Sequence, residues 1–216
     1  FGHATAVDAD TLAVSMPGYT GPGFSTPNGA VMMYQRSGSR WSLTQTIEGL
    51  IVDSGFGEAL ALQGDQLIIA DPDAPGNGRA WYYRRDTSGV WQEINSFGVG
   101  NLSPSPRYAD ALSLRNDRLF VSAPLDANAT GSVHLHTRTN DLWNLAQSLQ
   151  IPGVQPGSRA GDALTQNDDH LFVGIPGNAS IPGRVAVYPI MSGSVGTPSI
   201  ITDPAQGQIG FGGSIS

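Results

Sequence analysis

Short apolar runs, each closed by a proline, recur along the chain at nearly constant spacing. They are AVSMP at 13–17, IIADP at 68–72, FVSAP at 120–124 and FVGIP at 172–176. Several of these runs are continuously apolar rather than alternating, which is typical of β-strands buried on both faces, and the proline stops further ladder pairing. No segment shows the 3.6-residue period of an amphipathic helix. The pattern therefore predicts an all-β chain of short strands.

Each apolar run belongs to a longer repeat of about 52 residues. Four twelve-residue segments superimpose without gaps and begin at positions 1, 56, 108 and 160. A two-residue turn precedes each apolar run: Ala9-Asp10, Gly64-Asp65, Asn116-Asp117 and Asp168-Asp169. Gly, Asn and Asp tolerate the positive φ that such a hairpin demands. Each repeat therefore opens with a β-hairpin.

Two further runs complete each repeat. The third run follows a loop that ends in glycine, namely Gly29, Gly78, Gly131 or Gly183. The fourth opens on Trp41, Trp91 or Trp143, while the fourth repeat has lost this tryptophan near Val195. A four-stranded sheet buried on both faces needs a like sheet on either side, which the radial repetition of a propeller supplies.

We therefore predict one partial β-propeller over residues 1–216, built of four-stranded antiparallel blades. The repeats are expected at 1–55, 56–107, 108–159 and 160–210, and Phe211-Gly212 starts a fifth at 211–216.

The starts of the repeats carry a family resemblance. Phe1-Gly2 and Phe56-Gly57, followed by degenerate Gly-Ala-Pro equivalents such as Ser122-Ala123-Pro124, resemble the FG-GAP repeat over essentially the whole chain. The resemblance implies a propeller of the kind found in integrin α heads and in secreted or surface proteins of microbes. Integrin-type repeats hold calcium in a loop between the first two strands, whereas here only two turn residues stand at that place. We therefore expect no cofactor, and no calcium bound in the integrin manner.

The charge balance narrows the possible partners. The chain has 18 acidic residues and 11 basic ones, all of them Arg, for a net charge of −7. This field repels nucleic acids and anionic membrane surfaces. The longest aliphatic stretch, 67–70, is far too short to span a bilayer. We expect no nucleic-acid partner and no membrane insertion.

Candidate metal ligands are few. Asp71 and Asp73, with Asn77 close by, offer the oxygen ligands that a hard cation accepts, but the closing Glu of a calcium loop is missing. His134 and His136 lie two residues apart on one face of a strand, a spacing that can bind a metal. In the aligned repeats these positions hold Met, Trp, Ala or Tyr, which favours a packing role.

Two acidic columns recur in the repeats. Glu58, Asp110 and Asp162, matched by His3, come just after the start of each innermost strand, where they could line a central channel or simply solvate a strand end. The aspartate of each hairpin turn is interpreted as architecture, because a catalytic carboxylate appears once per site rather than once per repeat. No nucleophile elbow, Walker loop or zinc-hydrolase motif occurs. The sequence predicts no catalytic residues.

Binding is expected on the variable loops at 18–28, 73–77, 125–130 and 177–182, since loops on a rigid scaffold are where recognition resides. Tyr19, Phe24 and Asp126 are the candidate partner-binding residues in these loops. Asn101, Asn128 and Asn178 begin glycosylation sequons.

Together these features predict a non-enzymatic, extracellular or cell-surface module for adhesion, protein binding or surface assembly, with a protein or glycan partner. Two alternatives are a lectin-like propeller that binds glycans between blades, and the subunit of a surface filament that self-assembles by strand pairing between subunits. An enzyme with its site in the central channel would need a blade with polar channel residues that the other blades lack. The sequence shows no such blade.

Overall fold

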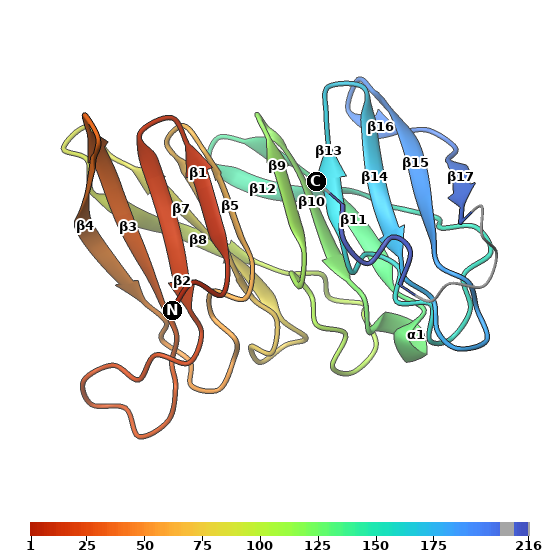
Figure 1. Cartoon of the computed structure of the whole chain (residues 1–216), viewed down its shortest axis with the longest axis horizontal. Helices are drawn as coiled ribbons and strands as arrows, with labels where there is room; N and C mark the ends of the chain where they lie inside the picture. Colours follow the sequence, from red (N-terminus) through yellow and green to blue (C-terminus); the bar gives the residue numbers. More distant parts are fainter. Residues whose placement is uncertain (204–209, 216) are drawn as a thin grey trace. The chain divides into compact units, whose positions relative to one another are not determined.

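The computed structural model describes residues 1–203 and 210–215 and contains four antiparallel sheets (Figure 1). The first blade holds β1 (Thr5–Asp8), β2 (Thr11–Met16), β3 (Ala30–Ser37) and β4 (Arg40–Glu48). The second holds β5 (Leu60–Gln63), β6 (Gln66–Asp71), β7 (Arg79–Arg85) and β8 (Trp91–Phe97). The third holds β9 (Leu112–Arg115), β10 (Arg118–Ala123), β11 (Ser132–Thr139) and β12 (Leu142–Ser148).

The fourth blade departs from this scheme at its outer edge. It holds β13 (Leu164–Gln166), β14 (His170–Ile175) and β15 (Arg184–Met191), and its outer strand is split into β16 (Ser194–Val195) and β17 (Ser199–Thr202), which both pair with β15. One short helical turn, α1 (Asp126–Ala129), precedes β11. The all-β fold of propeller blades with four-stranded antiparallel sheets, predicted from the sequence, is confirmed.

Each blade is a meander whose strands follow chain order. The second strand is the most deeply buried: all six residues of β6 are buried, and so are five of the six in β10. Continuous apolar runs form this strand because both of its faces lie inside the blade. The third and fourth strands share a β-bulge at the same place in the first three blades, after Met33, Tyr82 and Leu135.

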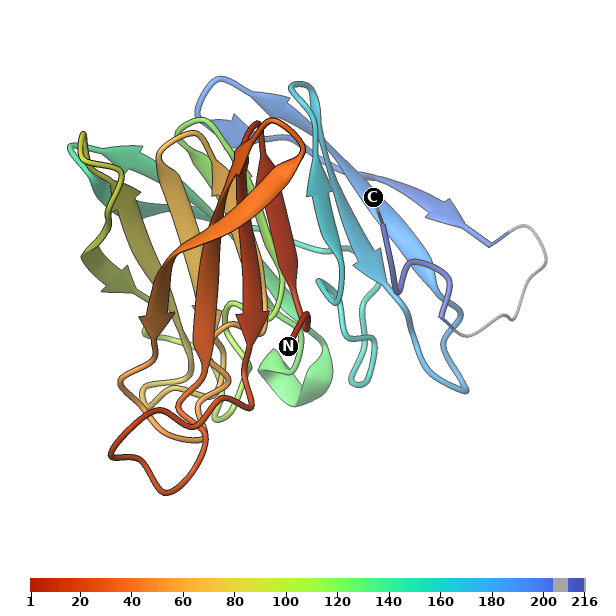
Figure 2. The same cartoon turned by 60° about the vertical axis from the view of Figure 1, so that its left-hand side comes forward.

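The chain forms two compact units, Phe1–Gly98 and Val99–Ser216, each containing two blades. Within each unit the innermost strands lie side by side, β1 beside β5 and β9 beside β13 (Figures 1 and 2). Apolar side chains fill the space between the paired blades. Met33, Ile69 and Trp91 belong to this core in the first unit, and Leu135, Val173 and Tyr188 belong to it in the second.

Within each unit, the start of a repeat packs on the preceding blade at a glycine. A side chain at Gly29 would collide with the main-chain oxygen of Phe56, and one at Gly131 would collide with that of Ala160. Gly183 has the same relation to Phe211, so the first residues of the fifth repeat lie against the fourth blade. At Gly29, Gly131 and Gly183, the glycine that ends the loop therefore marks the place where the next repeat docks.

A glutamine holds neighbouring blades together at their outer edge. The side-chain amide of Gln45 in β4 donates to the main-chain oxygen of Trp91 (2.9 Å) and accepts from its N–H (2.8 Å). Gln147 in β12 makes the same two bonds with Val195. Each glutamine replaces a missing strand partner for one residue of the next blade. Among the described residues, no helix is long and apolar enough to cross a membrane.

Candidate functional site

Charged side chains gather where the innermost strands of the second unit begin. Arg107 and Asp110 precede β9, and Arg159 and Asp162 precede β13. We call these four residues the rim site. The backbone here is tied to the second strand of each blade, because Ala109 N–H donates to Ser122 O and Gly161 N–H donates to Gly174 O, both at 2.8 Å. The rim site therefore stands on a fixed backbone.

Both arginines of the rim site have a left-handed backbone. The φ angles are +55° at Arg107 and +53° at Arg159, whereas the same position in the second blade is Gly55 and before the fifth repeat is Gly210. Glycine adopts this conformation without strain, but an L-residue with a side chain pays about 1–2 kcal/mol. An arginine in place of glycine in two neighbouring blades is a strained residue of the kind that collects at functional sites.

Each arginine is held by the carboxylate three residues later. Arg107 Nε donates to Asp110 Oδ1 at 2.7 Å, and Arg159 Nε lies 3.0 Å from Asp162 Oδ2. The hydrogen bond with Asp162 raises the pKa of Arg159, and the charge of Asp110 in the neighbouring blade adds to this effect. The two blades therefore share one cluster of two guanidinium and two carboxylate groups.

The first unit has a different group at the equivalent place. His3 Nε2 lies 2.9 Å from Glu58 Oε2, which bridges two neighbouring blades across the starts of their innermost strands. The acidic column Glu58, Asp110 and Asp162 thus lies at strand starts, as the sequence indicates. The sequence reading missed the arginines beside it, although a comparison of the residue before each repeat start would have found them.

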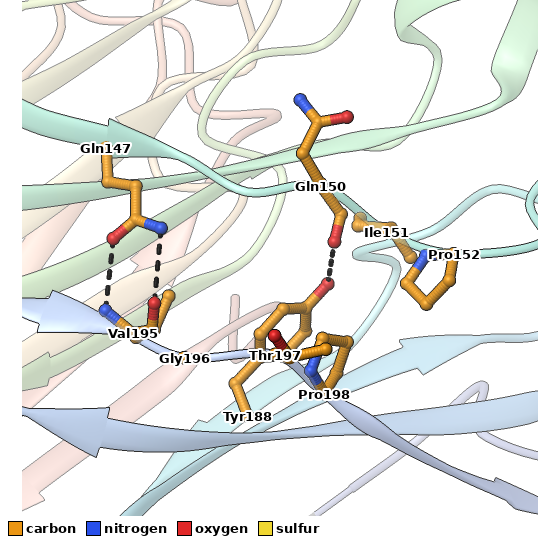
Figure 3. A pocket seen from close by; sticks show the side chains of 9 residues that line it. All are labelled: Gln147, Gln150, Ile151, Pro152, Tyr188, Val195, Gly196, Thr197 and Pro198. Carbon is orange, nitrogen blue, oxygen red and sulfur yellow. Dashed lines mark hydrogen bonds between the residues drawn. The ribbon is translucent and has the colours of Figure 1, made fainter.

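The structure also contains a pocket of about 440 Å³ between the outer strands of the third and fourth blades (Figure 3). Its walls include the glutamine bridge from Gln147 to Val195 and the Tyr188 hydroxyl, which donates to the main-chain oxygen of Gln150 at 2.7 Å. Burial raises the pKa of Tyr188 above its usual value of 10.0. No Arg, Asp, Glu or His lines the pocket, so among the described residues it offers no general acid or base for chemistry near neutral pH.

The hairpin-turn aspartates have structural partners. Asp10, Asp65 and Asp117 accept hydrogen bonds from the arginines at the end of the third strand of their own blades, Arg36, Arg84 and Arg138. The main-chain oxygen of each turn aspartate also accepts an N–H from that strand, and Asp169 does the same with Ile190. These hydrogen bonds join the hairpin turn to the third strand of the same blade, which is the structural role that the repetition of the aspartate in the sequence suggested.

The residues singled out for a cation lie at the end of β6. Asp71 is buried and accepts a hydrogen bond from Trp81 Nε1 at 2.9 Å, and burial raises the pKa of its carboxyl group. Asp73 is exposed, and Asn77 has a left-handed backbone with φ of +80°. In the described ranges, no group of three or more His, Asp or Glu side chains is arranged to hold a metal ion.

The histidine pair of β11 is buried and takes part in hydrogen bonds within its blade. His134 Nδ1 lies 2.9 Å from Ser148 Oγ and its Nε2 lies 3.0 Å from Ser132 Oγ, while His136 Nε2 lies 2.8 Å from the Tyr108 hydroxyl. Burial lowers the pKa of His134 to about 4 and that of His136 to about 3. Both rings are neutral parts of the core near pH 7, which fits the packing role inferred from the alignment.

The loop residues proposed for partner binding are spread over both units. Tyr19 and Phe24 lie half-buried in the first loop, where the Tyr19 hydroxyl donates to Glu48 Oε1 at 3.2 Å. Asp126 begins α1 in the second unit and accepts from the N–H groups of Ser103 and Ala127. Burial alone would raise the pKa of Asp126, but these hydrogen bonds, with those from Ser103 and Ser132 side chains, lower it.

The sequon asparagines differ in exposure. Asn101 and Asn128 are exposed, and Asn128 has a left-handed backbone within α1. Asn178 is half-buried and its Oδ1 accepts from the N–H groups of Ser180 and Ile181. Asn101 and Asn128 are therefore the more accessible of the three sequon asparagines.

Comparison with known proteins identifies the fold of this chain but shows no family to which it belongs. No protein-family model and no curated protein matches this sequence. A solved structure described as "a putative 6-phosphogluconolactonase" from Bacteroides uniformis ATCC 8492 is similar to 94% of this chain, with a TM-score of 0.65 and 11% identity. A second structure with the same description, from Bacteroides fragilis NCTC 9343, is similar to 97% of this chain, with a TM-score of 0.63 and 14% identity.

This chain spans 58% and 59% of the two Bacteroides chains, less than two thirds of either. At these identities the likeness establishes a propeller-like fold. It also corrects the functional prediction: the similar structures are described as enzymes rather than as FG-GAP adhesins. The expectation of a non-enzymatic adhesion, glycan-binding or filament module is therefore wrong. It failed because the repeat pattern reports the scaffold, which adhesins and enzymes share.

Proposed function

We propose that this chain is part of a larger β-propeller enzyme that hydrolyses the lactone ring of a sugar acid at the rim site. The observation that carries the proposal is the pair of strained arginines. Arg107 and Arg159 occupy a glycine position in neighbouring blades, and each is oriented by an aspartate three residues later. The two guanidinium groups have no counterpart in the second blade, where Gly55 stands at this position, and a central-channel enzyme requires such a difference between blades.

The comparison supports a proposal about the size of the whole propeller. Four blades that correspond to 58% of a Bacteroides chain imply about seven blades of equal size in that chain. We propose that the protein containing this chain has a propeller of similar size, with repeats 1–55, 56–107, 108–159 and 160–210 as four of its blades. The rim site then lies where the innermost strands of two neighbouring blades, β9 and β13, begin.

The groups of the rim site suit lactone hydrolysis. Asp110 accepts a proton from a water molecule as the water oxygen forms a bond to the lactone carbonyl carbon. A guanidinium N–H of Arg159 donates to the carbonyl oxygen as it becomes an oxyanion, and it is already fixed by Asp162 before the reaction begins. When the ring C–O bond breaks, the proton on Asp110 passes to the departing ring oxygen. The products are one hydroxyl and one carboxylic acid, and Asp110 is again a carboxylate.

The substrate class rests on the descriptions of the two similar structures and on the charge of the site. Two guanidinium groups balance two carboxylates, so the rim site is nearly neutral and accepts the hydroxyl groups of a sugar. A phosphate on the sugar would compete with the aspartates for the arginines. An assay with paired substrates, phosphorylated and not, therefore identifies which form the site accepts.

The test is a lactonase assay on the native protein that contains this chain, with six-carbon aldonolactones that carry or lack a terminal phosphate. Acid release above the spontaneous rate on either substrate is expected. Arg159→Gly should reduce kcat/KM by about 100-fold, because it removes the oxyanion donor. It should leave the free energy of unfolding within ~1 kcal/mol of wild type, because glycine suits the left-handed backbone.

Arg115→Ala is the matched control, since Arg115 forms an ion pair with Asp168 at the opposite end of the innermost strands. This variant should keep full activity. No hydrolysis of any lactone by the native protein, or equal loss of activity in Arg115→Ala and Arg159→Gly, would refute the proposal.

We also propose that the repeats of this chain share ancestry with the FG-GAP repeat. Its support is the aromatic-Gly start of the repeats at Phe1, Phe56 and Phe211, which docks on a loop-ending glycine of the preceding blade at Gly29 and Gly183. An extracellular or cell-surface location is proposed with it. Fractionation of the native cells, with detection of the protein in the medium, the surface fraction or the cell interior, tests the location.

A further inference from the structure

The pocket between the third and fourth blades arises from a break in the outer strand of the fourth blade. The corresponding strands β4, β8 and β12 run on through a bulge, whereas the outer strand of the fourth blade stops at Val195 and resumes at Ser199. Gly196, Thr197 and Pro198 fill the gap, and Pro198 has no N–H to donate to the ladder. All three residues line the pocket.

Three aromatic residues of the first unit have no aromatic counterpart around this pocket. The core between the first two blades contains Phe56, Trp81 and Trp91. The corresponding positions between the third and fourth blades, by repeat alignment, are Ala160, Ala186 and Val195. Trp91 is 3% exposed and is held by Gln45, and Val195 is held in the same way by Gln147. The backbone bridge is therefore retained while the indole ring that it positions in the first unit is absent from the second.

The walls of the pocket are fixed and uncharged. Gln147 uses both atoms of its amide on Val195, and the Tyr188 hydroxyl is bonded to Gln150 O (Figure 3). Apolar surface comes from the Tyr188 ring and from Ile151, Pro152 and Pro198. Within the described part of the chain, the Gln150 side chain and the Thr197 hydroxyl make no hydrogen bond with another residue, so they can serve a ligand. A rigid, uncharged pocket that combines apolar surface with a few polar groups is typical of small-molecule sites.

From this geometry we propose that the pocket between β12 and the split outer strand is a second binding site, for a planar, uncharged aromatic or heteroaromatic small molecule of about the size of indole. The ligand takes the place that a tryptophan ring takes in the first unit, stacked near Tyr188 and the two prolines. Its ring N–H or other polar atom meets Gln150 or Thr197. Because no charged side chain lines the pocket, a carboxylate on the ligand has no counter-ion there.

The test uses indole itself as the probe, by ligand-observed saturation-transfer NMR and by the shift of Tm with indole concentration. Saturable binding and a rise in Tm are expected for the native protein. Val195→Trp restores the residue that the other repeats have and should weaken indole binding at least ~10-fold by filling the pocket. Val195→Leu fills it only in part and is more conservative, so an intermediate loss is expected even where the tryptophan variant does not fold.

Three comparisons complete the test. Indole-3-acetate should bind more weakly than indole, and glucose should not bind. Arg159→Gly should bind indole as the native protein does, so this site and the lactonase proposal fail or succeed independently. No saturable indole binding, equal binding to native protein and Val195→Leu, or preference for glucose or for indole-3-acetate would overturn the proposal.

Discussion

At the scale of single residues, glycines with positive φ lie where one repeat meets the next within each unit, at Gly29 and Gly131. Gly29 has φ of +74°, and a side chain there would run into Phe56. Arg107 and Arg159 show the opposite choice, since they accept the strain that glycine avoids. These two arginines therefore keep a side chain at a position where the second blade has Gly55, at a cost in stability.

Gly29→Ala tests the docking contact. The variant should lower the free energy of unfolding by about 3 kcal/mol, from left-handed strain and from overlap with the Phe56 main chain. Gly38→Ala is the matched control, because Gly38 has φ of +62° with open space around it, and it should cost only about 1 kcal/mol. Urea denaturation followed by circular dichroism measures both. Equal losses would mean that the Phe56 contact contributes nothing.

The buried histidines make stability depend on pH. The pKa of His134 is about 4 in the fold and 6.5 in the unfolded chain, so the unfolded state binds more protons in this interval. Stability is therefore full above pH 6.5, falls as the pH drops below 6.5, and stops falling on account of this group below about pH 4. His134→Met, the residue found at this position in the first repeat, should flatten the fall between pH 6.5 and 4.

Urea unfolding at a series of pH values checks this prediction. At pH 7.5 the His134→Met variant should lose about 1–2 kcal/mol, because Ser132 and Ser148 lose their partner. Ser148→Ala keeps the imidazole and removes one partner, so it should lower stability at neutral pH without flattening the pH dependence. An unchanged slope in His134→Met would show that the ring does not resist protonation in the fold.

At the scale of elements, the fourth strand of each blade is the one that changes. It is exposed along much of its length, as in β4, where Leu43 is exposed and Ile47 is buried. In the first and third blades this strand is tied to the next blade by one glutamine rather than by a ladder. In the fourth blade the outer strand is split into β16 and β17, and the pocket lies beside the split.

Gln45→Ala tests this connection. The side chain makes two hydrogen bonds with the main chain of Trp91, and their loss should lower the free energy of unfolding by about 2 kcal/mol. Ser42→Ala, at an exposed position on the same strand, should change stability by less than ~0.5 kcal/mol. Denaturant titration monitored by tryptophan fluorescence reports both. A loss as small as that of the control would show that the glutamine bridge contributes no stability.

At the scale of the whole molecule, charge determines which partners can approach. The net charge of −7 comes from 18 acidic and 11 basic residues, and six arginines, including Arg36, Arg115 and Arg159, form ion pairs with aspartates in the described part of the chain. We expect no binding of duplex DNA in fluorescence anisotropy at physiological salt. Anisotropy that rises with protein concentration and falls with added salt would contradict this expectation.

The sequence by itself determined the period, the strands and the hairpin turns of this protein. These features are local: a run such as 67–70 must be buried, and a turn such as Asn116-Asp117 must accept positive φ, whatever surrounds it. The alignment of repeats also predicted that the hairpin aspartates and His134 with His136 serve structure. Repetition gave this information because a column of equivalent residues shows which roles are shared by all blades.

Only the tertiary structure decided where the blades differ in function. Arg159 and Asp110 are 49 residues apart, and only the packing of β13 beside β9 brings their charges together. The pocket likewise depends on a lost tryptophan in one blade facing Gln147 of another. A repeat pattern describes what the blades share, while a binding site uses what they do not share. For this reason the sequence predicted the scaffold and misjudged the function.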